Sequence, residues 1–222
     1  MKKIIAIVPI RKGSQRVKNK NFRPFAKKNL LAYKIETLKK IDFFDDIIIN
    51  TDSDEAIAIS KELNVNHVKR EPYFASSECP NSDFWKHIAE TTQSEYIVFT
   101  NCTSPLIKLD TYKKLGELYE THLLSNKFDS INTVTEIREF LFLNNKPLNF
   151  QINKTPNSQD LPDVVKLNFA VNILKTEIMN SQRSLLGNKP YLFKLDEIEG
   201  FDINTEFEFS YAEQLFKNFN NG

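Results

Sequence analysis

The stretch IIAIVPIRKGSQRVKNKN, residues 4–21, decides the fold of this chain. Its first five residues, Ile4–Val8, are apolar and bounded by Pro9, which is typical of a buried β-strand, and the remainder is a polar loop. In open α/β sheets, ligands bind beside the carboxyl ends of the strands, where such a loop lies. The stretch therefore predicts a site for several negative charges, such as a polyphosphate. Six cations stand in this loop and directly after it, namely Arg11, Lys12, Arg16, Lys18, Lys20 and Arg23.

The charge of the chain is unevenly distributed. The whole sequence holds 30 Lys and Arg against 29 Asp and Glu, but residues 1–35 hold eleven cations and no acid. A focused basic patch argues against nucleic acid or a membrane as the partner, because either would need basic charge spread over a face. A basic arm that binds RNA stays an alternative hypothesis, which requires residues 11–23 to be exposed and RNA binding to depend on salt.

Length and composition predict one domain over residues 1–222. With 41% apolar residues, a chain of this length can bury a core of its own. No apolar run reaches the length of a membrane span, and the first residues meet Pro9 and cations too soon for a signal peptide. Cys79 and Cys102 follow no pattern and are expected to be free thiols in a cytoplasmic protein. The three histidines are isolated, so no zinc site is predicted.

Apolar periodicity predicts alternating strands and helices. This alternation indicates an α/β fold with a doubly wound, mostly parallel sheet and helices on both faces. Further strands at residues 130–135 and 167–174 flank residues 144–164, which are rich in Asn, Pro, Asp and Gln and are expected to form a hairpin-bearing excursion. The earlier elements are expected, in chain order, at strand 4–8, helix 30–38, strand 45–50, a helix after Asp52, strand 65–68, a helix after Ser82, strand 96–100 and a helix after Asp110.

Polar residues mark the expected starts of three helices. Asp52 and Glu55 have the spacing of a capping box, and Ser82 is expected to cap the next helix. Thr205 and Glu208 form a second capping box at the last helix. This start places the buried stripe of the last helix at Phe207, Tyr211 and Leu215.

The first four predicted strands all end in polar residues, and on a parallel sheet these ends meet at one edge. The residues there include cations, hydroxyls and amides but no adjacent nucleophile and base, which favours phosphoryl or nucleotidyl transfer over acyl transfer. Neither a Walker sequence nor a dinucleotide-binding fingerprint is present. The polar segments are residues 11–21, 51–53, 70 and 101–104.

Transfer from a nucleoside triphosphate needs a divalent cation held by oxygen ligands. The best candidates lie in GFDINT, residues 200–205, where Asp202 and Asn204 point the same way if the segment is extended. Gly200 permits a close approach to this segment. A purely structural interpretation stays open here, in which Asn204 or Thr205 only caps the last helix.

Together these motifs resemble those of the acylneuraminate cytidylyltransferases, the CMP-sialic acid synthetase family. The loop after the first strand is similar to the family pattern I-P-A-R-G-G-S-K-R-I-P-x-K-N. The matches extend over nearly the whole chain. Five more follow in the family's order, at residues 50–55, 69–72, 75–77, 103–106 and 201–206.

The resemblance implies a nucleotide-diphosphosugar transferase fold whose β-hairpin excursion, here at about residues 133–168, reaches across to the partner of a homodimer. It implies transfer of CMP from CTP to a small acidic acceptor, with Mg²⁺ and with release of pyrophosphate, for surface polysaccharide biosynthesis.

The resemblance also assigns roles to individual residues. Catalysis falls to Arg11, Lys20 and Asp202, and the metal to Asp202 and Asn204. The nucleotide is expected on Arg11, Lys12, Gly13, Ser14, Asn21, Arg70, Asn81 and Ser82. The acceptor is expected on Asn101, Thr103, Ser104, Lys166 and Asn168.

The chain departs from the family pattern where the metal and the acceptor bind. The second metal aspartate is Asn204, the Arg of an Arg-x-x-L-P pattern is Ser158, a sugar-site Arg is Lys166, and an Asn-Gly pair is Asn168-Phe169. Lysine is a point charge and does not replace a bidentate arginine. The expected acceptor is therefore another 2-keto sugar acid, a sugar phosphate or a phosphonate. The alternative function is a non-catalytic nucleotide-binding homologue that regulates or scaffolds a partner enzyme.

Overall fold

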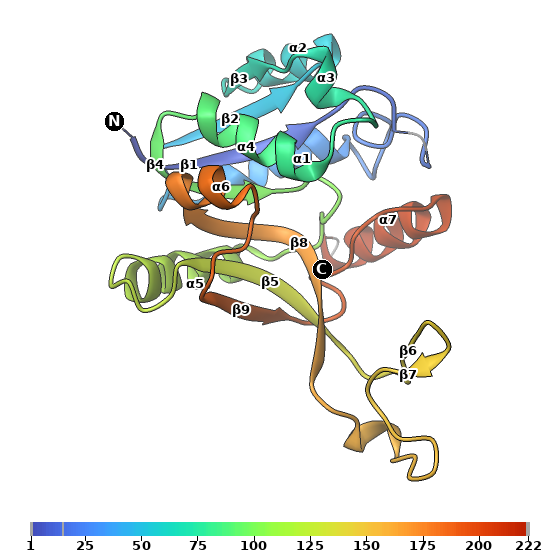
Figure 1. Ribbon diagram of the computed structural model, residues 1–222. Coiled ribbons are helices and arrows are strands. Elements are labelled where there is room, and N and C mark those ends of the chain that lie inside the picture. Colours follow the sequence, from blue (N-terminus) through green and yellow to red (C-terminus); the bar gives the residue numbers. More distant parts are fainter. Residues whose placement is uncertain (1, 15, 221–222) are drawn as a thin grey trace.

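The computed structural model describes residues 2–14 and 16–220, and a seven-stranded mixed sheet forms the centre of this part of the chain (Figure 1). The strand order is β3-β2-β1-β4-β8-β5-β9. β8 pairs antiparallel with β4 and β5, and all other neighbours are parallel, which confirms the predicted mostly parallel sheet. The strands are β1 (Lys2–Ile10), β2 (Asp46–Thr51), β3 (Asn66–Lys69), β4 (Ser94–Thr100), β5 (Ser130–Ile137), β8 (Val164–Lys175) and β9 (Pro190–Leu195).

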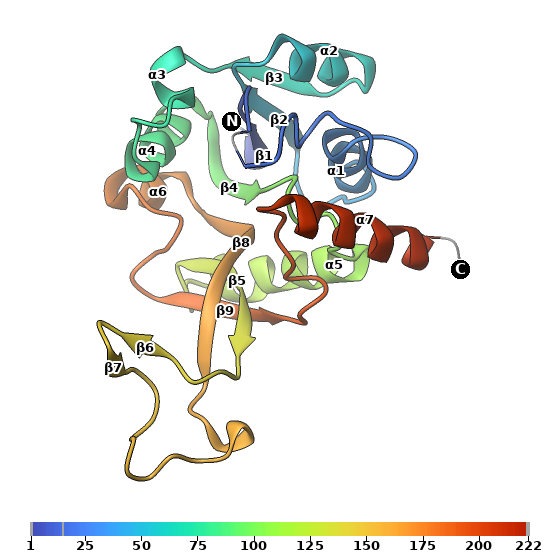
Figure 2. The same cartoon turned by 90° about the vertical axis from the view of Figure 1, so that its right-hand side faces the viewer.

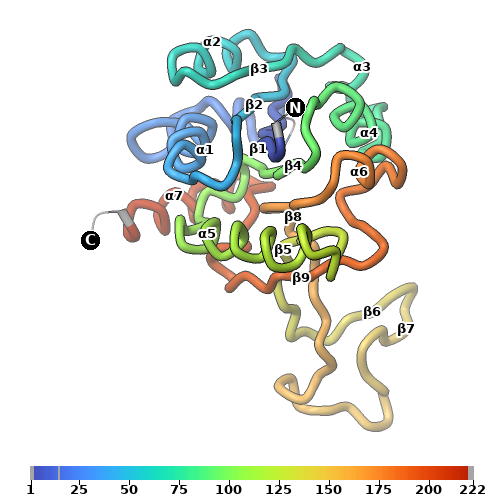
Figure 3. The backbone as a smooth tube through the Cα atoms, turned by 90° about the vertical axis from the view of Figure 1, so that its left-hand side faces the viewer, coloured from blue at the N-terminus to red at the C-terminus, as the bar shows by residue number. Residues whose placement is uncertain are grey.

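β1 is apolar on both sides because both faces of the sheet are covered. Ile4 and Val8 belong to one hydrophobic cluster, and Ile5 and Ile7 belong to a second cluster on the opposite face. Figure 2 and Figure 3 view the sheet from opposite sides along its strands and show helices on both faces, so the doubly wound arrangement is confirmed. The first cluster is covered by α1 (Leu30–Leu38), α2 (Asp54–Glu62), α5 (Leu109–Leu118) and α7 (Glu206–Asn220), the second by α4 (Asn81–Thr91) and α6 (Thr176–Gln182).

The strand order reverses beside β1, because β2 and β3 lie on one side of it and β4 lies on the other. In open α/β sheets, ligands bind at this reversal, next to the carboxyl ends of the strands. Residues 11–29 follow β1 and residues 101–108 follow β4. Figure 2 shows both segments at the edge that faces the viewer, together with the start of α7. The polar loops that the sequence predicts to meet therefore do meet.

Two of the predicted helix caps are wrong. α2 begins after Ser53, whose side chain accepts a helix N–H, whereas Asp52 accepts the N–H of Lys12 through Oδ1 at 2.7 Å. Ser and Asp are comparable caps, so the tertiary contact of Asp52 decides between them. α4 begins after Pro80 without a side-chain cap, and Ser82 is an ordinary residue of its first turn.

The third predicted cap, at α7, is confirmed. The Glu208 N–H donates to Thr205 Oγ1 at 3.2 Å, and Glu208 Oε2 accepts the N–H groups of Thr205 and Asn204, both at 2.7 Å. This cap fixes the direction in which the chain enters α7 from the segment that holds Asp202.

The predicted buried stripe of α7 is wrong. Phe207 and Tyr211 are 78% and 45% exposed, and Leu215 is only partly buried. Instead Phe209 is buried and packs edge-on against Phe25, with ring centres 5.4 Å apart. Phe25 belongs to the loop after β1, so a residue far away in the sequence selects the buried face of the helix.

Residues 138–163 form the excursion and project from the body of the molecule between β5 and β8 (Figure 1). They contain the antiparallel hairpin of β6 (Phe142–Leu143) and β7 (Lys146–Pro147), which confirms the predicted hairpin, and the 3₁₀-helix η2 (Ser158–Asp160). Large apolar side chains are exposed on it, namely Phe140, Phe142, Leu143, Leu148 and Ile152.

The sequence patterns give no sign of α6 or β9. Two further short elements are α3 (Pro72–Ala75) and η1 (Tyr119–Leu123), a turn of π-helix that continues α5. Over residues 2–14 and 16–220, no helix has the length and apolar character that crossing a membrane requires.

Candidate active site

The loop after β1 is shaped by a glycine and by a buried anchor. Gly13 has a φ of +76, a backbone conformation that residues other than glycine rarely adopt. A Cβ built on Gly13 would meet no heavy atom within 4 Å, so the backbone angle rather than crowding favours glycine here. Val17 is fully buried in the core, whereas Arg11 and Lys12 are exposed and Ser14 is half-buried. The loop therefore presents exposed cations, which are groups that bind phosphates.

Cations of this loop contact the segment before α7. Arg16 Nη2 donates to Asn204 Oδ1 at 2.8 Å, and Lys20 Nζ donates to the carbonyl oxygen of Ile203 at 2.5 Å. Arg23 Nη1 donates to both carboxylate oxygens of Glu206, at 3.0 and 2.8 Å. The basic start of the chain and residues 203–206 thus form one continuous site.

Asp202 and Asn204 lie side by side, as the extended segment predicts. Asn204 Nδ2 donates to Asp202 Oδ2 at 2.7 Å. The other carboxylate oxygen, Asp202 Oδ1, is buried and has no hydrogen-bond partner among the described residues. Mg²⁺ is commonly held by one or two carboxylates together with substrate phosphates, so this oxygen fits such a metal. Residues 2–14 and 16–220 contain no cluster of three His, Cys, Asp or Glu that would hold a metal without substrate.

Lys20 is a half-buried cation of the site. Burial lowers the pKa of its ammonium group, the Asp202 carboxylate opposes this shift, and the charges of Arg16 and Arg11 reinforce it. A desolvated cation gains more from an anionic ligand than an exposed one does. Asn21, at the end of the same loop, has a buried Oδ1 without a partner among the described residues.

Arg70 connects the strand ends to α4. It is 5% exposed, and Nε and Nη2 donate to Oδ1 and to the carbonyl oxygen of Asn50, both at 2.7 Å. Its guanidinium lies 4.2 Å above the ring of Phe84. Burial lowers the pKa of Arg70 to about 10, and the nearby charge of Arg11 adds to this shift while Asp52 opposes it. The structure thus places Arg70 beside the cationic loop and holds it in fixed contacts.

The remaining predicted nucleotide residues, Asn81 and Ser82, lie in the first turn of α4, three and two residues before Phe84. Asn81 is exposed and Ser82 is half-buried. The stacking of Arg70 on Phe84 therefore brings this turn to the edge that carries the cationic loop.

In the loop after β4, hydrogen bonds within the protein hold the backbone and the side chain of Asn101 in place. Asn101 Nδ2 donates to the carbonyl oxygen of Phe169 at 3.2 Å, and the carbonyl oxygen of Thr103 accepts the Ile203 N–H at 2.9 Å. Ser104 is fully buried, and its carbonyl oxygen accepts from Lys34 Nζ at 3.1 Å. The structure brings Asn101 and Thr103 to the site but leaves Ser104 in the core below it.

A cavity of about 580 Å³ adjoins the Asp202 segment. Its wall includes Lys166, Asn168, Phe169 and Gly200, so it contains two predicted acceptor residues. It also contains residues that no sequence pattern marks, namely Thr135, Glu136, Ile137, Arg138, Glu139 and Glu197. These come from the end of β5, from the first two residues of the excursion and from the turn after β9, and only the tertiary structure brings them together.

The side chain of Asn168 is engaged in hydrogen bonds within the protein. It is 8% exposed, its Oδ1 accepts from Thr133 Oγ1 at 2.7 Å and from the Ala170 N–H at 3.1 Å, and its Nδ2 donates to Thr135 Oγ1 at 2.9 Å. A Cβ on Gly200 would lie 2.2 Å from Thr135 Oγ1, which confirms that a close approach requires glycine there.

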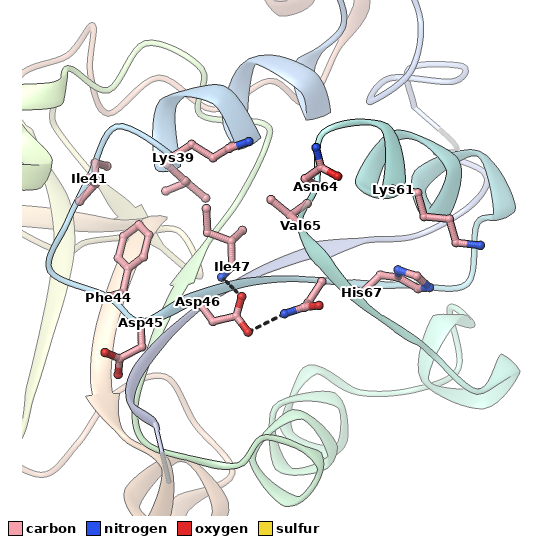
Figure 4. A pocket seen from close by; sticks show the side chains of 12 residues that line it. Lys39, Ile41, Phe44, Asp45, Asp46, Ile47, Lys61, Asn64, Val65 and His67 are labelled. Atoms are coloured by element: carbon pink, nitrogen blue, oxygen red, sulfur yellow. Dashed lines mark hydrogen bonds between the residues drawn. The ribbon is translucent and has the colours of Figure 1, made fainter.

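A second cavity, of about 630 Å³, lies at the opposite edge of the sheet, around the starts of β2 and β3 (Figure 4). The carboxylate of Asp46 accepts hydrogen bonds from the Ile47 N–H at 2.8 Å and from Asn66 Nδ2 at 2.7 Å. This cavity contains none of the predicted site residues.

The two cysteines are expected to react very differently. Cys102 is 2% exposed and burial raises the pKa of its thiol to about 12, whereas Cys79 is partly exposed. Because the thiolate is the reactive form, iodoacetamide near neutral pH is expected to label Cys79 at least about a hundredfold faster than Cys102. Peptide mass spectrometry of the native and the urea-unfolded protein checks this. Equal labelling in the native state would contradict the burial of the loop after β4.

Known proteins show the same fold over the full chain. A solved structure of a CMP:2-keto-3-deoxy-manno-octonic acid synthetase complexed with CTP superposes with a TM-score of 0.72 at 11% identity, covering 97% of this chain and 99% of the other. A 4-diphosphocytidyl-2C-methyl-D-erythritol synthase from Anaerococcus prevotii superposes with a TM-score of 0.67 at 12% identity, covering 97% and 96%. At these identities the likeness shows the fold alone.

Sequence comparisons give the family. A "Post-translational flagellin modification protein B" of Campylobacter coli is 28% identical over 98% of this chain and 96% of its own length. A "CMP-N,N'-diacetyllegionaminic acid synthase" of Campylobacter jejuni is 27% identical over 97% and 95%. The family profile described as "Cytidylyltransferase" matches residues 5–215. The chain therefore belongs to the cytidylyltransferase family, whose CTP-dependent nucleotidyltransferases include the CMP-sialic acid synthetases that its motifs resemble.

Proposed function

We propose that this protein transfers CMP from CTP to a sugar acid and releases pyrophosphate. The observation that carries the proposal is the contact of Arg16 and Lys20 with residues 203–204 beside the 580 Å³ cavity. The cations suit a triphosphate, Asp202 suits a divalent metal, and the cavity has the volume of a small-molecule site. Family membership and the similarity to synthases of CMP-linked sugar acids support the same reaction.

In the proposed reaction, a hydroxyl oxygen of the acceptor attacks the α-phosphorus of CTP. The bond from this phosphorus to the bridging oxygen breaks, the electron pair leaves with pyrophosphate, and the hydroxyl proton passes to water. Arg11 and Ser14 bind the phosphates, and Lys20 offsets the charge that develops on the leaving group. Positioning and charge neutralisation therefore provide most of the catalysis.

We propose Mg²⁺ as the metal of this reaction. Asp202 Oδ1 and the amide oxygen of Asn204 would hold it together with phosphate oxygens, and the bound metal would withdraw charge from the α-phosphate and the pyrophosphate. One carboxylate and one amide carry a smaller charge than two carboxylates. We therefore expect the metal to bind together with CTP rather than before it.

The proposed acceptor carries a carboxylate, for which Lys166 is an exposed cation of the cavity wall; the other exposed cation there, Arg138, is paired with Glu136 and Asp163. Sugar phosphates and phosphonates are further acceptor classes that the same lysine suits. The CMP-conjugate would serve as an activated donor for surface polysaccharides. We place the reaction in the cytoplasm, which agrees with the free thiols of Cys79 and Cys102.

The test of this function is pyrophosphate release with CTP and Mg²⁺ over a panel of 2-keto sugar acids, sugar phosphates and phosphonates. ATP, GTP and UTP serve as controls for the base. Release with CTP and a sugar acid supports the proposal, and release with a phosphate or phosphonate alone would replace the acceptor class. Tight CTP binding without release over the whole panel would favour the non-catalytic alternative.

We further propose that the excursion, residues 138–163, forms a homodimer. Its exposed apolar side chains are arranged on a rigid base: Asn149 donates to the carbonyl oxygen of Glu139 and accepts the Leu141 N–H, both at 2.9 Å. Phe150 packs edge-on against Phe140 at 5.0 Å between ring centres. Large apolar side chains exposed together on one segment are typical of protein interfaces.

Phe142→Asp is expected to convert a dimer into a monomer. Phe142 is 59% exposed, so the change leaves the folded chain intact but places a charge in the proposed apolar interface. Sedimentation velocity measures the outcome. Leu124→Asp, at a residue 37% exposed at the end of η1, is the control and is expected to leave the dimer unchanged. A wild-type protein that sediments as a monomer would contradict the proposal.

A further inference from the structure

Asp52 is an acid beside the cationic loop, at the point where β2 ends. Its side chain is half-buried, and Oδ1 accepts the backbone N–H of Lys12 at 2.7 Å. A carboxylate next to a site for polyphosphate repels the ligand, so its presence there needs a physical reason. Capping of α2 is not that reason, because Ser53 accepts the Ala56 N–H and caps the helix instead.

The hydrogen bond to Lys12 connects the two chain segments beyond the last paired residues of their strands. The parallel pairing of β1 with β2 ends at Ile10 and Thr51. Past this point, a carboxylate oxygen of Asp52 rather than a backbone carbonyl oxygen accepts the N–H. Gly13 follows directly with its φ of +76, so the fixed N–H lies immediately before the left-handed turn of the loop.

The acceptor side of this bond is held by regular structure. Thr51 is fully buried, its Oγ1 accepts the Ser53 N–H at 3.0 Å, and its carbonyl oxygen accepts the Arg70 N–H at 2.7 Å. Ser53 in turn caps α2. The carboxylate that meets the cationic loop is therefore carried by the sheet and by a helix start, not by a second loop.

The charge of Asp52 also acts on the two arginines of the site. Burial lowers the pKa of Arg70 to about 10, the Asp52 carboxylate opposes this shift, and the charge of Arg11 adds to it. Both arginines are among the residues expected to bind the nucleotide, and their like charges repel each other while the site is empty. The carboxylate offsets part of that repulsion before a ligand is bound.

We infer that Asp52 is a positioning residue for the proposed cytidylyl transfer: its hydrogen bond to the Lys12 N–H holds residues 11–14 in the conformation that binds the phosphates of CTP. The inference rests on the proposed function, because it assigns these residues to the phosphates. A loop that is ordered before the ligand arrives loses less conformational freedom on binding. Asp52 therefore strengthens CTP binding and takes no part in the chemical step.

Asp52→Asn and Asp52→Ala separate the hydrogen bond from the charge. Both variants remove the negative charge, but only asparagine keeps an oxygen that can accept the Lys12 N–H. The Kd for CTP is measured by titration calorimetry with Mg²⁺ and without an acceptor. Asp52→Asn is expected to bind CTP at least as tightly as the wild type, because a repulsive charge is lost. Asp52→Ala is expected to bind about tenfold more weakly than Asp52→Asn.

Two further measurements distinguish positioning from a merely structural role. Hydrogen exchange in peptides that cover residues 11–14 is expected to be faster in Asp52→Ala than in Asp52→Asn without CTP, and equal when CTP saturates. Because bound CTP itself orders the loop, kcat at saturating CTP is expected to agree within about twofold between the two variants.

Asp54→Ala is the matched control. It removes a carboxylate two residues later, from an exposed ion pair with Lys69 at 3.3 Å, and is expected to bind CTP as the wild type does. Equal CTP affinity in Asp52→Asn and Asp52→Ala would overturn the inference. A loss of kcat as large as the loss of affinity would also overturn it, since Asp52 would then act in the chemical step.

The same measurements tell a failure of the inference from a failure of the proposed reaction. If the two variants differ in CTP affinity as expected but the wild type releases no pyrophosphate with any acid, the positioning role is supported and the reaction is wrong. If pyrophosphate is released and the two affinities are equal, the reaction is supported and the positioning role is wrong. A wild type that binds no CTP would overturn both.

Discussion

Asp202→Asn is expected to lower kcat for pyrophosphate release by about a thousandfold. The substitution replaces the carboxylate whose Oδ1 is buried and receives no hydrogen bond from the part of the chain that the structure describes, and this is the oxygen that we assign to the metal. An amide at this position retains an oxygen that accepts from Asn204 Nδ2, so the local fold is expected to persist. Because Oδ1 is buried without a hydrogen-bond partner among the described residues, loss of the negative charge is expected to leave Tm unchanged or higher.

Steady-state kinetics with CTP and thermal unfolding of the same sample check this expectation. Asp110→Asn is the matched control, because it removes a carboxylate from an exposed pair with Lys113 at the start of α5. The control is expected to retain its kcat. Full turnover by Asp202→Asn, or the same loss in the control, would contradict the metal assignment.

Lys20→Met is expected to lower kcat by about a hundredfold and to weaken CTP binding. Lys20 Nζ contacts the Ile203 carbonyl oxygen, and its confined charge lies near Asp202, so it reaches both the phosphates and the metal segment. Methionine retains most of the apolar length of the side chain and removes only the charge and the hydrogen bond.

Titration calorimetry with CTP and steady-state kinetics measure the two effects of Lys20→Met. Lys27→Met is the control, because Lys27 is exposed and lies outside the cavity of the acceptor. Lys20→Arg is expected to restore part of the activity, since arginine keeps the charge. Unchanged CTP affinity in Lys20→Met would show that Lys20 only supports residues 202–204.

The strands at the centre of the sheet are predictable because their side chains face two covered surfaces. β1 needs apolar residues on both sides, and this gives the continuous run that marks it. The cationic loop is predictable for a related reason: six cations without an acid are incompatible with burial, and their place after a buried strand indicates a ligand. Both features are local in the sequence.

The features that the sequence does not predict depend on distant partners. The buried side of α7 is determined by its packing against Phe25. Asp52 does not cap α2 because its carboxylate accepts the N–H of Lys12 instead. Arg16 and Asn204 are 188 residues apart and have no shared pattern before the chain folds. The cavity that we propose for the acceptor is the least predictable part, since its wall is assembled from β5, β8 and the turn after β9.

The most direct test of cytidylyl transfer follows both products by ³¹P NMR. CTP, Mg²⁺ and the sugar acid that the panel selects are mixed with the protein, and the α-phosphate and the pyrophosphate are observed together. We predict that one phosphodiester of CMP with the acid appears for each pyrophosphate released, and that neither forms with Asp202→Asn. Pyrophosphate released with free CMP instead of the conjugate, or no reaction with any acid while CTP is bound, would contradict the account.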